Sequence, residues 1–331
     1  MKTKKNSGWA LVAVTLAALG TCAEPIDVTA FGIRSDTNEN MTPAVRRLME
    51  ACTNKVAEIT FPKGRYDFWP DKPGGQSGAF RIEGARKLRF DGAGSAFIFH
   101  GLMNPFKITR SEDVVVRNFS FDWERPFITQ GRIIKVTDEA VDLAIDKARY
   151  PYVIENGRAW FMGEDWKRGV DGYNILYDRD TKEIVYKTRD NPLGLDFNKR
   201  AEEIASGAVR FYGKPKIKPE PGTYLALNHG RYLVTCFEVS RCADVTLKDI
   251  TVYHSLSHGV VASRTENLTF DAFNIVANEQ KERVFSSMAD GFHLIHCKGE
   301  VVIENCAHTG LGDDFLNTHG RNCVVLKRLD E

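Results

Sequence analysis

Three aspartates in the last fifth of the sequence have the residue type and grouping that acid–base chemistry requires. Asp290 opens an Asp-Gly-Phe-His segment, and Asp313 and Asp314 stand together in Gly-Asp-Asp-Phe-Leu-Asn-Thr-His-Gly. A glycoside hydrolase needs two carboxyl groups, one to protonate the leaving oxygen and one to activate water or attack the sugar. The segment therefore suggests hydrolysis of a glycosidic bond. The alternative is that these residues only form turns, where Asp and Gly are common.

The spacing of the aspartates fits one coil of a parallel β-solenoid. Asp313 follows Asp290 by 23 positions, and solenoid repeats span about 20–30 residues. The two residues would then lie on neighbouring rungs of one face. Because paired strands are about 4.8 Å apart, outward side chains would hold the carboxyls about 5–9 Å apart, which covers both geometries of two-carboxylate hydrolysis.

We expect Asp290, Asp313 and Asp314 to share the acid and base roles, because like charges held close together oppose ionisation of all three. The sequence does not say which is the acid and which is the base. Adjacent residues of a regular strand point to opposite faces. Asp313 and Asp314 can therefore both face a substrate only if Gly312 opens a turn or bulge.

Four further polar residues are predicted to bind substrate. His293, Asn317 and His319 lie in the same two segments, and His258-Gly259 aligns with Asp290-Gly291 one coil earlier. Taken singly, each histidine is more often structural or on the surface than functional. No metal site and no cofactor is predicted, and the cysteines show no Cys-x-x-Cys zinc pattern.

Five short segments predict the strands of the solenoid, because each places a polar residue before alternating apolar residues. Where the repeat is uninterrupted, one step between consecutive segments is longer than the others. That step contains a polar insertion, Asn278 to Arg283, which would bulge from the coil. A β-sandwich is the alternative for short, regularly spaced strands. The segments are Lys87–Phe90, Asp113–Val116, Asp244–Leu247, Asn267–Phe270 and Glu300–Ile303.

The region before these strands predicts a cap for the solenoid. Ile26 to Ile33 suggests a first strand, and Thr42-Pro43 suggests a helix start with Thr42 as the N-cap. Apolar residues at helical spacing then give the helix one buried face, and strand Ala57–Phe61 follows. An amphipathic helix at this position would cover the open end of a solenoid. The apolar residues are Val45, Leu48, Met49 and Cys52.

The solenoid pattern is interrupted between Glu124 and Gly230. Seven strand-like segments there are separated by turn residues, which predicts an inserted antiparallel sheet or small barrel that walls one side of the site. Its aromatic residues Trp160, Trp166, Tyr173 and Phe197 could stack on sugars, although most are expected to form the core of the insertion. The segments are 131–137, 140–145, 159–162, 173–177, 183–187, 208–212 and 223–227.

The first 23 residues predict a secretory signal peptide. Lys2, Lys4 and Lys5 precede the apolar run Trp9 to Leu19, and a small-residue cleavage site follows. Secretion or a periplasmic location is therefore expected, with lipid attachment at Cys22 as a minor alternative. No other run is long and apolar enough to span a membrane. The net charge of +1 among 331 residues gives no sign of a nucleic-acid partner.

The expected organisation is all-β. It comprises the signal peptide 1–23, the capped first part of a right-handed parallel β-helix at 24–123, an inserted barrel-like domain at 124–230, and the continuing β-helix with the site at 231–331. A solenoid ending near Glu331 would leave a sheet edge uncovered. We therefore expect either that the chain is truncated or that another chain covers this edge. The oligomeric state is left undecided. The six cysteines after the leader are expected as buried thiols, with disulfides as the alternative.

Several of these motifs together resemble glycoside hydrolase family 110, the bacterial α-1,3-galactosidases. The motifs are Phe61–Phe68, Phe121–Pro126 followed by Thr129-Gln130-Gly131, Asp290–His293 and Asp313–Gly320. The resemblance implies a pectin-lyase-like β-helix with inserted barrels and cleavage with inversion. It also implies that galactose-terminated glycans are the substrates and that Asp290, Asp313 and Asp314 are the reacting carboxylates. Members of the family are markedly longer than this chain.

Two other functions stay open at this stage. Polygalacturonases carry a similar Asp-Gly, Asp-Asp and His-Gly order, but the Arg-x-Lys that they use for a substrate carboxylate is not seen here. A lyase or polygalacturonase acting on acidic glycans would need a basic cleft, and the near-zero net charge argues mildly against one. A non-catalytic glycan-binding β-helix would tolerate replacement of all three aspartates by Asn.

Overall fold

The computed structural model describes residues 25–320, and these residues are predominantly β. They contain one α-helix, α1 (Thr42–Cys52), and two 3₁₀ helices, η1 (Val28–Phe31) and η2 (Glu279–Lys281). The predicted signal peptide, with Cys22, and Cys323 lie outside the described residues. The cysteines within them, Cys52, Cys236, Cys242, Cys297 and Cys306, are free thiols.

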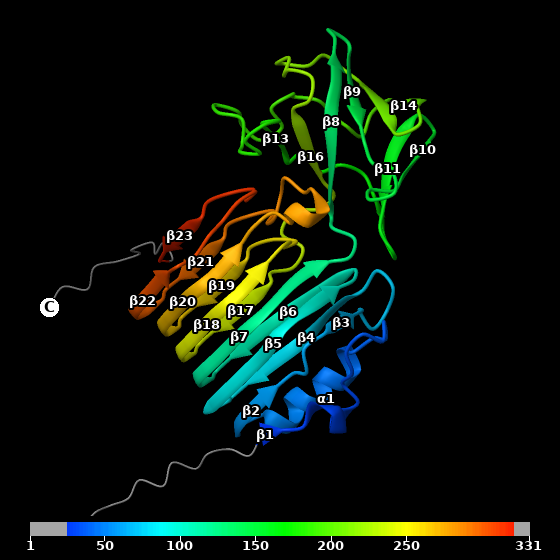
Figure 1. The fold of residues 1–331 in the computed structure, drawn as a ribbon. Coiled ribbons are helices and arrows are strands. Elements are labelled where there is room, and N and C mark those ends of the chain that lie inside the picture. The colour runs from blue at the N-terminus through cyan, green and yellow to red at the C-terminus, as the bar shows by residue number, and fades with distance from the viewer. Residues whose placement is uncertain (1–24, 321–331) are drawn as a thin grey trace, which may run out of the picture.

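Two parallel sheets form the main body of the molecule (Figure 1). From residue 65 onward, apart from a long inserted segment, the chain alternates between them, so that a strand of one sheet is followed by a strand of the other; we call each such pair of strands a layer. The eight-stranded sheet comprises β1 (Pro25–Ile26), β2 (Val56–Thr60), β5 (Lys87–Phe99), β7 (Glu112–Trp123), β18 (Ala243–Val252), β20 (Glu266–Ile275) and β22 (Lys298–Glu304), with β3 (Arg65–Phe68) beside β5. The six-stranded sheet comprises β4 (Gln76–Glu83), β6 (Leu102–Thr109), β17 (Phe237–Ser240), β19 (Val260–Ser263), β21 (Phe292–Ile295) and β23 (Leu316–His319).

The five predicted solenoid strands all form, and they pair in register in the eight-stranded sheet. The second residue of each predicted segment is paired with its counterpart: Leu88 with Val114, Val114 with Val245, Val245 with Leu268, and Leu268 with Val301. A slip of one residue would turn every apolar side chain outward, so the alternating pattern fixes this register. The prediction from the pattern is confirmed.

The core lies between the two parallel sheets and is rich in phenylalanine. Phe80, Phe106 and Phe237 stack one above the other, with ring centroids 4.4 and 4.6 Å apart. All three are fully buried. Stacking of like residues from successive layers follows directly from the parallel register, because paired positions of neighbouring strands point the same way.

Helix α1 lies at the N-terminal end of the sheets (Figure 1) and buries the apolar face that the sequence predicts. The predicted N-cap is wrong, since Thr42 is the first helical residue and Met41 precedes it without a side-chain cap. The Thr42 hydroxyl instead donates to the carbonyl of Trp69 at 2.9 Å. This hydrogen bond ties the helix to the chain that follows β3.

The predicted first strand, Ile26 to Ile33, is also wrong beyond its start. Strand β1 ends at Ile26, and the Asp27 carboxylate accepts a hydrogen bond from Thr29 N at 2.9 Å. Such a local side-chain bond competes with strand pairing and caps the short helix η1 instead.

The segment between β7 and β17 forms antiparallel sheets, as predicted for the insertion. The predicted strand Glu183–Lys187 does not form, and only an isolated bridge joins Ile184 to Tyr177. One sheet has six strands: β13 (Asn174–Tyr177), β16 (Tyr224–Asn228), β8 (Ile128–Val136), β9 (Ala140–Ala144), β15 (Ala208–Tyr212) and β14 (Ala201–Ala205). The other has three: β10 (Tyr152–Glu155), β11 (Arg158–Met162) and β12 (Lys167–Arg168).

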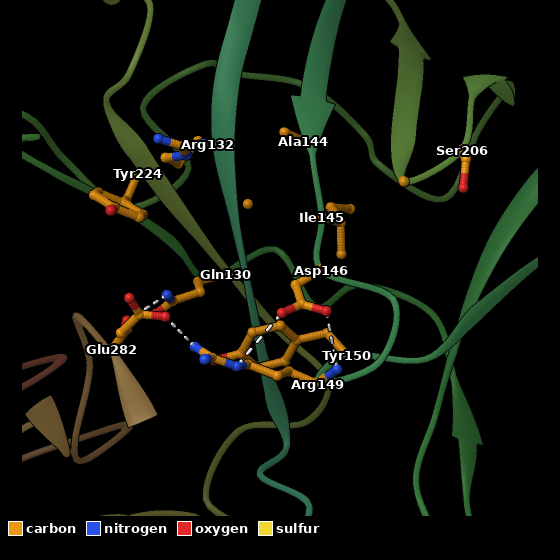
Figure 2. Close-up of a pocket in the computed structure, with 12 residues that line it drawn as sticks. Gln130, Arg132, Ala144, Ile145, Asp146, Arg149, Tyr150, Ser206, Tyr224 and Glu282 are labelled. Carbon is orange, nitrogen blue, oxygen red and sulfur yellow. Dashed lines mark hydrogen bonds and ion pairs between the residues drawn. The ribbon is translucent and has the colours of Figure 1, made fainter. Parts of the chain in front are cut away.

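The predicted polar bulge, Asn278 to Arg283, contains η2 and joins the insertion to the parallel sheets. Gln130 of β8 donates to the carbonyl of Glu282 at 2.8 Å and accepts from Val284 N at 2.9 Å. Arg149 pairs with the Glu282 carboxylate at 2.6 Å, beside a cavity between β8, β9 and this bulge (Figure 2). Because the chain runs from this bulge straight to Asp290, the insertion is anchored close to the candidate site.

Candidate active site

Three segments that lead into strands of the six-stranded sheet stack on one another. They are 254–259, 286–291 and 310–315, which precede β19, β21 and β23. Backbone hydrogen bonds join them, from Gly259 N to the carbonyl of Asp290 at 3.0 Å and from Gly291 N to that of Asp314 at 2.9 Å. The parallel sheets therefore fix where the polar residues of these segments lie.

The register makes His258, Asp290 and Asp314 equivalent positions of successive layers. Val260 pairs with Phe292, and Phe292 pairs with Leu316. The predicted alignment of His258-Gly259 with Asp290-Gly291 is confirmed. The predicted rung spacing of 23 is one too short, because it is Asp314, 24 positions after Asp290, that occupies the equivalent place.

The glycines after His258 and Asp290 allow this close stacking. A Cβ at Gly259 would come within 2.8 Å of the carbonyl oxygen of Gly291, and a Cβ at Gly291 within 2.8 Å of that of Phe315. Either contact is too short for real atoms, so a side chain would push the layers apart. The His-Gly and Asp-Gly pairs thus reflect backbone packing as well as chemistry.

The three aspartates come together in space. One carboxylate oxygen from each of Asp290, Asp313 and Asp314 lies within 4.8 Å of the others. Asp290 is 4% exposed, whereas Asp313 and Asp314 are exposed. The chain bends at 312–315 before β23 begins, so these two neighbours are not held on opposite faces of a strand. Gly312 lets this segment pack against the preceding layer, since a Cβ there would lie 2.5 Å from the carbonyl oxygen of Met288.

His293 and His319 form a hydrogen-bonded chain that begins at Asp290. His293 Nδ1 lies 2.5 Å from Asp290 Oδ2, and its Nε2 lies 2.9 Å from His319 Nε2. His319 Nδ1 donates to the carbonyl of Gly320 at 2.9 Å. Both ring nitrogens of each histidine are thus occupied within the protein. His319 is exposed and His293 is half-buried.

His258 lies on the other side of Asp290, with Nε2 3.8 Å from Asp290 Oδ2. Its Nδ1 is 2.9 Å from the Ser257 hydroxyl. Burial lowers the pKa of His258, against the opposing charge of Asp290. The neutral imidazole is therefore the favoured form, beside a buried carboxyl group.

Asn317 lies directly beside His293, because β23 pairs Asn317 with His293 in register. Among the remaining histidines of this region, His308 stacks on Phe315 with centroids 4.0 Å apart. Of the predicted substrate-binding residues, His258 and His293 lie beside Asp290, whereas Asn317 lies beside His293 and His319 reaches Asp290 through His293.

Two groups of side chains have donor atoms close enough for one metal ion: His258 with Asp290 and His293, and the three aspartates. In the first group, the 2.5 Å contact of His293 with Asp290 is a hydrogen bond, which occupies both atoms. The sequence also contains one His-x-x-x-His spacing, His254 to His258. It forms no joint group, because the fully buried His254 ring is bonded to the carbonyl of Ser286.

The insertion supplies one side of the site through Tyr173. Its hydroxyl lies 3.0 Å from the carbonyl oxygen of Gly312 and 3.3 Å from Asp313 Oδ2. Burial and the nearby charge of Asp313 raise the pKa of Tyr173, so the phenol keeps its proton. Of the other aromatics singled out, Phe197 and Trp166 pack inside the insertion, against Phe211 and Phe127.

Two residues of the site were not predicted from the sequence, Arg231 and Tyr232. The Arg231 guanidinium lies 3.9 Å from the centroid of the Tyr173 ring and 4.0 Å from Asp313 Oδ2. Tyr232 stacks on His258 at 5.4 Å, is 49% exposed, and has a left-handed backbone with φ of 55°. Their position in the sequence could have indicated them. They follow the insertion directly and lead into β17, one layer before His258.

The fold and the site define a β-rich protein with a carboxylate and histidine cluster on stacked parallel strands. Residues 129–225 match the family model GLAA-B beta-barrel domain I. The chain is 33% identical to "Alpha-1,3-galactosidase B" of Bacteroides thetaiotaomicron, over 92% of this chain and 52% of the relative. It is 32% identical to "Alpha-1,3-galactosidase A" of Shewanella woodyi, over 89% and 51%.

By sequence the chain is similar to these alpha-1,3-galactosidases, which confirms the resemblance to glycoside hydrolase family 110. It spans about half the length of the curated relatives that it matches. Among the helices of residues 25–320, none has the length and apolar character that a membrane span requires.

Proposed function

We propose that the protein is a glycoside hydrolase that removes terminal α-1,3-linked galactose with inversion, and that Asp290, Asp313 and Asp314 share the acid and base roles. The observation that carries the proposal is the meeting of these three carboxyls on adjacent layers, with oxygens within 4.8 Å. Turn formation alone would not require Asp290 to be buried beside an imidazole. The relation to alpha-1,3-galactosidases supports the choice of substrate.

The environments of the aspartates suit a division of labour. Asp290 is buried and hydrogen-bonded to His293, whereas Asp313 is exposed and lies near Arg231 and Tyr173. Two carboxyls in different surroundings can hold different protonation states at one pH, as acid and base must. Inversion rests on the family relation, because these oxygens are closer than the separation of about 6.5–9.5 Å usual in inverting enzymes.

We propose that residues at the edge of the insertion hold the sugar. The exposed ring of Tyr232 offers a flat apolar face, and the Arg231 guanidinium offers donors beside Asp313 and the Tyr173 hydroxyl. A left-handed backbone is unusual for a bulky residue and is found preferentially at functional sites. Asn317 and His258 would add hydrogen bonds from the parallel sheets.

We further propose that the two parallel sheets are faces of a right-handed β-helix, with residues 124–230 as an inserted barrel-like domain. Parallel connections within a sheet are right-handed in about 98% of cases, which supports the hand. The Lys-rich, apolar start of the sequence supports export from the cell, with cleavage after residue 23.

The test is hydrolysis of an α-1,3-linked galactosyl oligosaccharide, with the anomer of the released sugar followed by proton NMR. The wild type should release β-galactose first. Asp313→Asn should lower the rate about 10²–10⁴-fold, because that is the usual contribution of a positioned proton donor or acceptor. Asp180→Asn is the matched control, since Asp180 is 77% exposed on the insertion and pairs with the neighbouring Arg179, away from the candidate site.

Each other outcome has a definite meaning. Release of α-galactose first would contradict inversion but leave the hydrolase. A folded wild type that releases no galactose would contradict the proposed substrate. Binding of the oligosaccharide without turnover, unaffected by Asp313→Asn, would favour a glycan-binding protein. An unsaturated product absorbing in the ultraviolet, formed from an acidic glycan, would identify a lyase.

A further inference from the structure

A chain of three hydrogen bonds leads from the buried Asp290 to an exposed histidine. It runs from Asp290 to His293 at 2.5 Å, from His293 to His319 at 2.9 Å, and from His319 to the Gly320 carbonyl at 2.9 Å. Asp290 and His293 belong to one layer and His319 to the next, so the stacking of the layers creates the chain.

The number of protons in this chain follows from its geometry. A carbonyl oxygen only accepts, so His319 Nδ1 carries a proton toward Gly320. One proton must lie between the two Nε2 atoms and one between His293 Nδ1 and Asp290. Three protons are therefore shared by two imidazoles and a carboxyl group. That is one more than an ionised carboxylate with two neutral rings would hold.

The extra proton can occupy any of three places without movement of a heavy atom. It can protonate the Asp290 carboxyl, or it can make an imidazolium of His293 or of His319. Each change shifts protons along existing hydrogen bonds. The chain thus connects a carboxyl group that is 4% exposed with an imidazole that contacts solvent.

We propose that His293 and His319 are a proton relay for Asp290, and not residues that bind the sugar. This inference rests on the proposed hydrolysis. Each turnover adds water across the glycosidic bond: the acid's proton goes to the leaving oxygen, and the base takes one from water. Each turnover leaves the acid one proton short and the base with one proton extra, so Asp290 in either role has to regain or release a proton before the next turnover. Its burial obstructs direct exchange, and the relay supplies the route through His319.

The groups facing the relay are consistent with an extra positive charge on it. Asp290 itself, with Asp313 and Asp314, offers negative charge on one side. His258, whose pKa is lowered by burial, adds no competing charge at neutral pH. Arg231 faces Asp313 at 4.0 Å, and His296 lies beside Gly320. His319 and His293 are therefore positioning residues that act through Asp290.

The experiment compares His319→Gln with His308→Gln in the full chain. Glutamine can still hydrogen-bond His293 but cannot pass on a proton. The kcat of His319→Gln should fall on the order of 10²-fold, at the lower end of what positioned proton transfer contributes. Its KM should stay within about twofold, and its pH–rate profile should narrow. His308 is an exposed histidine of the same region, stacked on Phe315 and outside the relay, so its variant should behave as wild type.

A second readout needs no turnover. Nitrogen NMR of histidine-labelled protein should show three protons at neutral pH, carried by the rings of His293 and His319 or shared with Asp290. His319→Gln should remove the proton shared between the two rings. Two neutral rings beside an ionised carboxylate would overturn the relay. So would a His319→Gln enzyme with raised KM and unchanged kcat. If the wild type releases no galactose, the proposed function fails while the NMR result still decides whether the proton chain exists.

Discussion

Two clusters in this molecule each place a histidine against a buried aspartate, one at either end of the parallel sheets. Near the N-terminal end, His100 lies 3.0 Å from Asp67 Oδ1 and 2.6 Å from Glu164 Oε2. Near the C-terminal end, His293 lies between Asp290 and His319. The first imidazole therefore has a carboxylate on both nitrogens, and the second has a carboxylate on one nitrogen and another imidazole on the other.

This difference distinguishes a cluster with a structural role from the one that we propose to do chemistry. His100 is 3% exposed, stacks on Trp69 at 3.6 Å, and joins the parallel sheets to the insertion through Glu164. Burial opposes its charged form, but the hydrogen bonds of Asp67 and Glu164 outweigh this and raise the pKa of His100. Both neighbours of the His100 ring are carboxylates that stabilise its charge, and neither ring nitrogen faces a second imidazole. Asp290 and His293 have one, His319, which reaches solvent.

Replacement of Asp290 should affect activity far more than stability. Asp290→Asn should lower galactose release about 10²–10⁴-fold, because an amide neither donates nor accepts the transferred proton. Its free energy of unfolding should change little, since His293 can still donate to the amide oxygen. Steady-state rates and urea unfolding measure the two effects. A stable variant with full activity would remove Asp290 from the proposed chemistry.

A third buried carboxylate, Asp122, pairs with Arg283 instead of a histidine, and its variants measure how much a buried ion pair contributes to stability. Arg283 contacts Asp122 at 2.5 Å, and both side chains are 3% exposed. Arg283→Met should destabilise the fold by about 3–5 kcal/mol, because it leaves a buried charge with one partner fewer. Arg149→Met, which breaks the exposed pair with Glu282, should cost at most about 1 kcal/mol. Equal losses in the two variants would contradict the role of burial.

His100→Gln should weaken the N-terminal cluster without touching the proposed chemistry. Glutamine cannot bridge both carboxylates with two charged donors, so a loss of about 1–3 kcal/mol of stability is expected. The kcat of the folded variant should match the wild type. Denaturant unfolding and initial rates below the unfolding transition test both statements. A loss of kcat with unchanged stability would show that the two clusters are not distinct in kind.

The smallest effect is expected in how the stability of the His100 cluster depends on pH. It is on the order of 1 kcal/mol for each unit by which a pKa is shifted. The pKa of His100 is raised from 6.5, so its contribution is complete below pH 6.5 and is lost as pH rises through the folded value. The pKa of Asp67 is lowered from 3.8: burial opposes this, but hydrogen bonds from His100 and Arg65 prevail. Its contribution is present above pH 3.8 and is lost as pH falls through the folded value.

The stability difference between wild type and His100→Gln should therefore be largest between about pH 4 and 6.5 and shrink on either side. Urea unfolding of both proteins across pH 3 to 9 measures it. A difference that stays constant from pH 5 to 9 would mean that His100 is not a cation in the folded state.

Much of the architecture could be predicted because it depends on local patterns. The alternation of apolar residues identified five strands and their register, and helical spacing identified α1. The errors arose where a side chain bonds its own backbone, as Asp27 does, or where an apparent strand has no partner, as at 183–187. Pairing partners are not encoded in a short segment, so pattern alone cannot separate these cases.

The sequence by itself determined which residues can do chemistry and that they recur at the spacing of the layers. It identified Asp290, Asp313 and Asp314, and it aligned His258-Gly259 with Asp290-Gly291. The tertiary structure decided the rest: the offset of 24, the contact of His319 with His293, and the entry of Arg231 and Tyr232 into the site. The physical reason is that these contacts form between layers, where backbone stacking brings together residues about 25 or more positions apart in the chain.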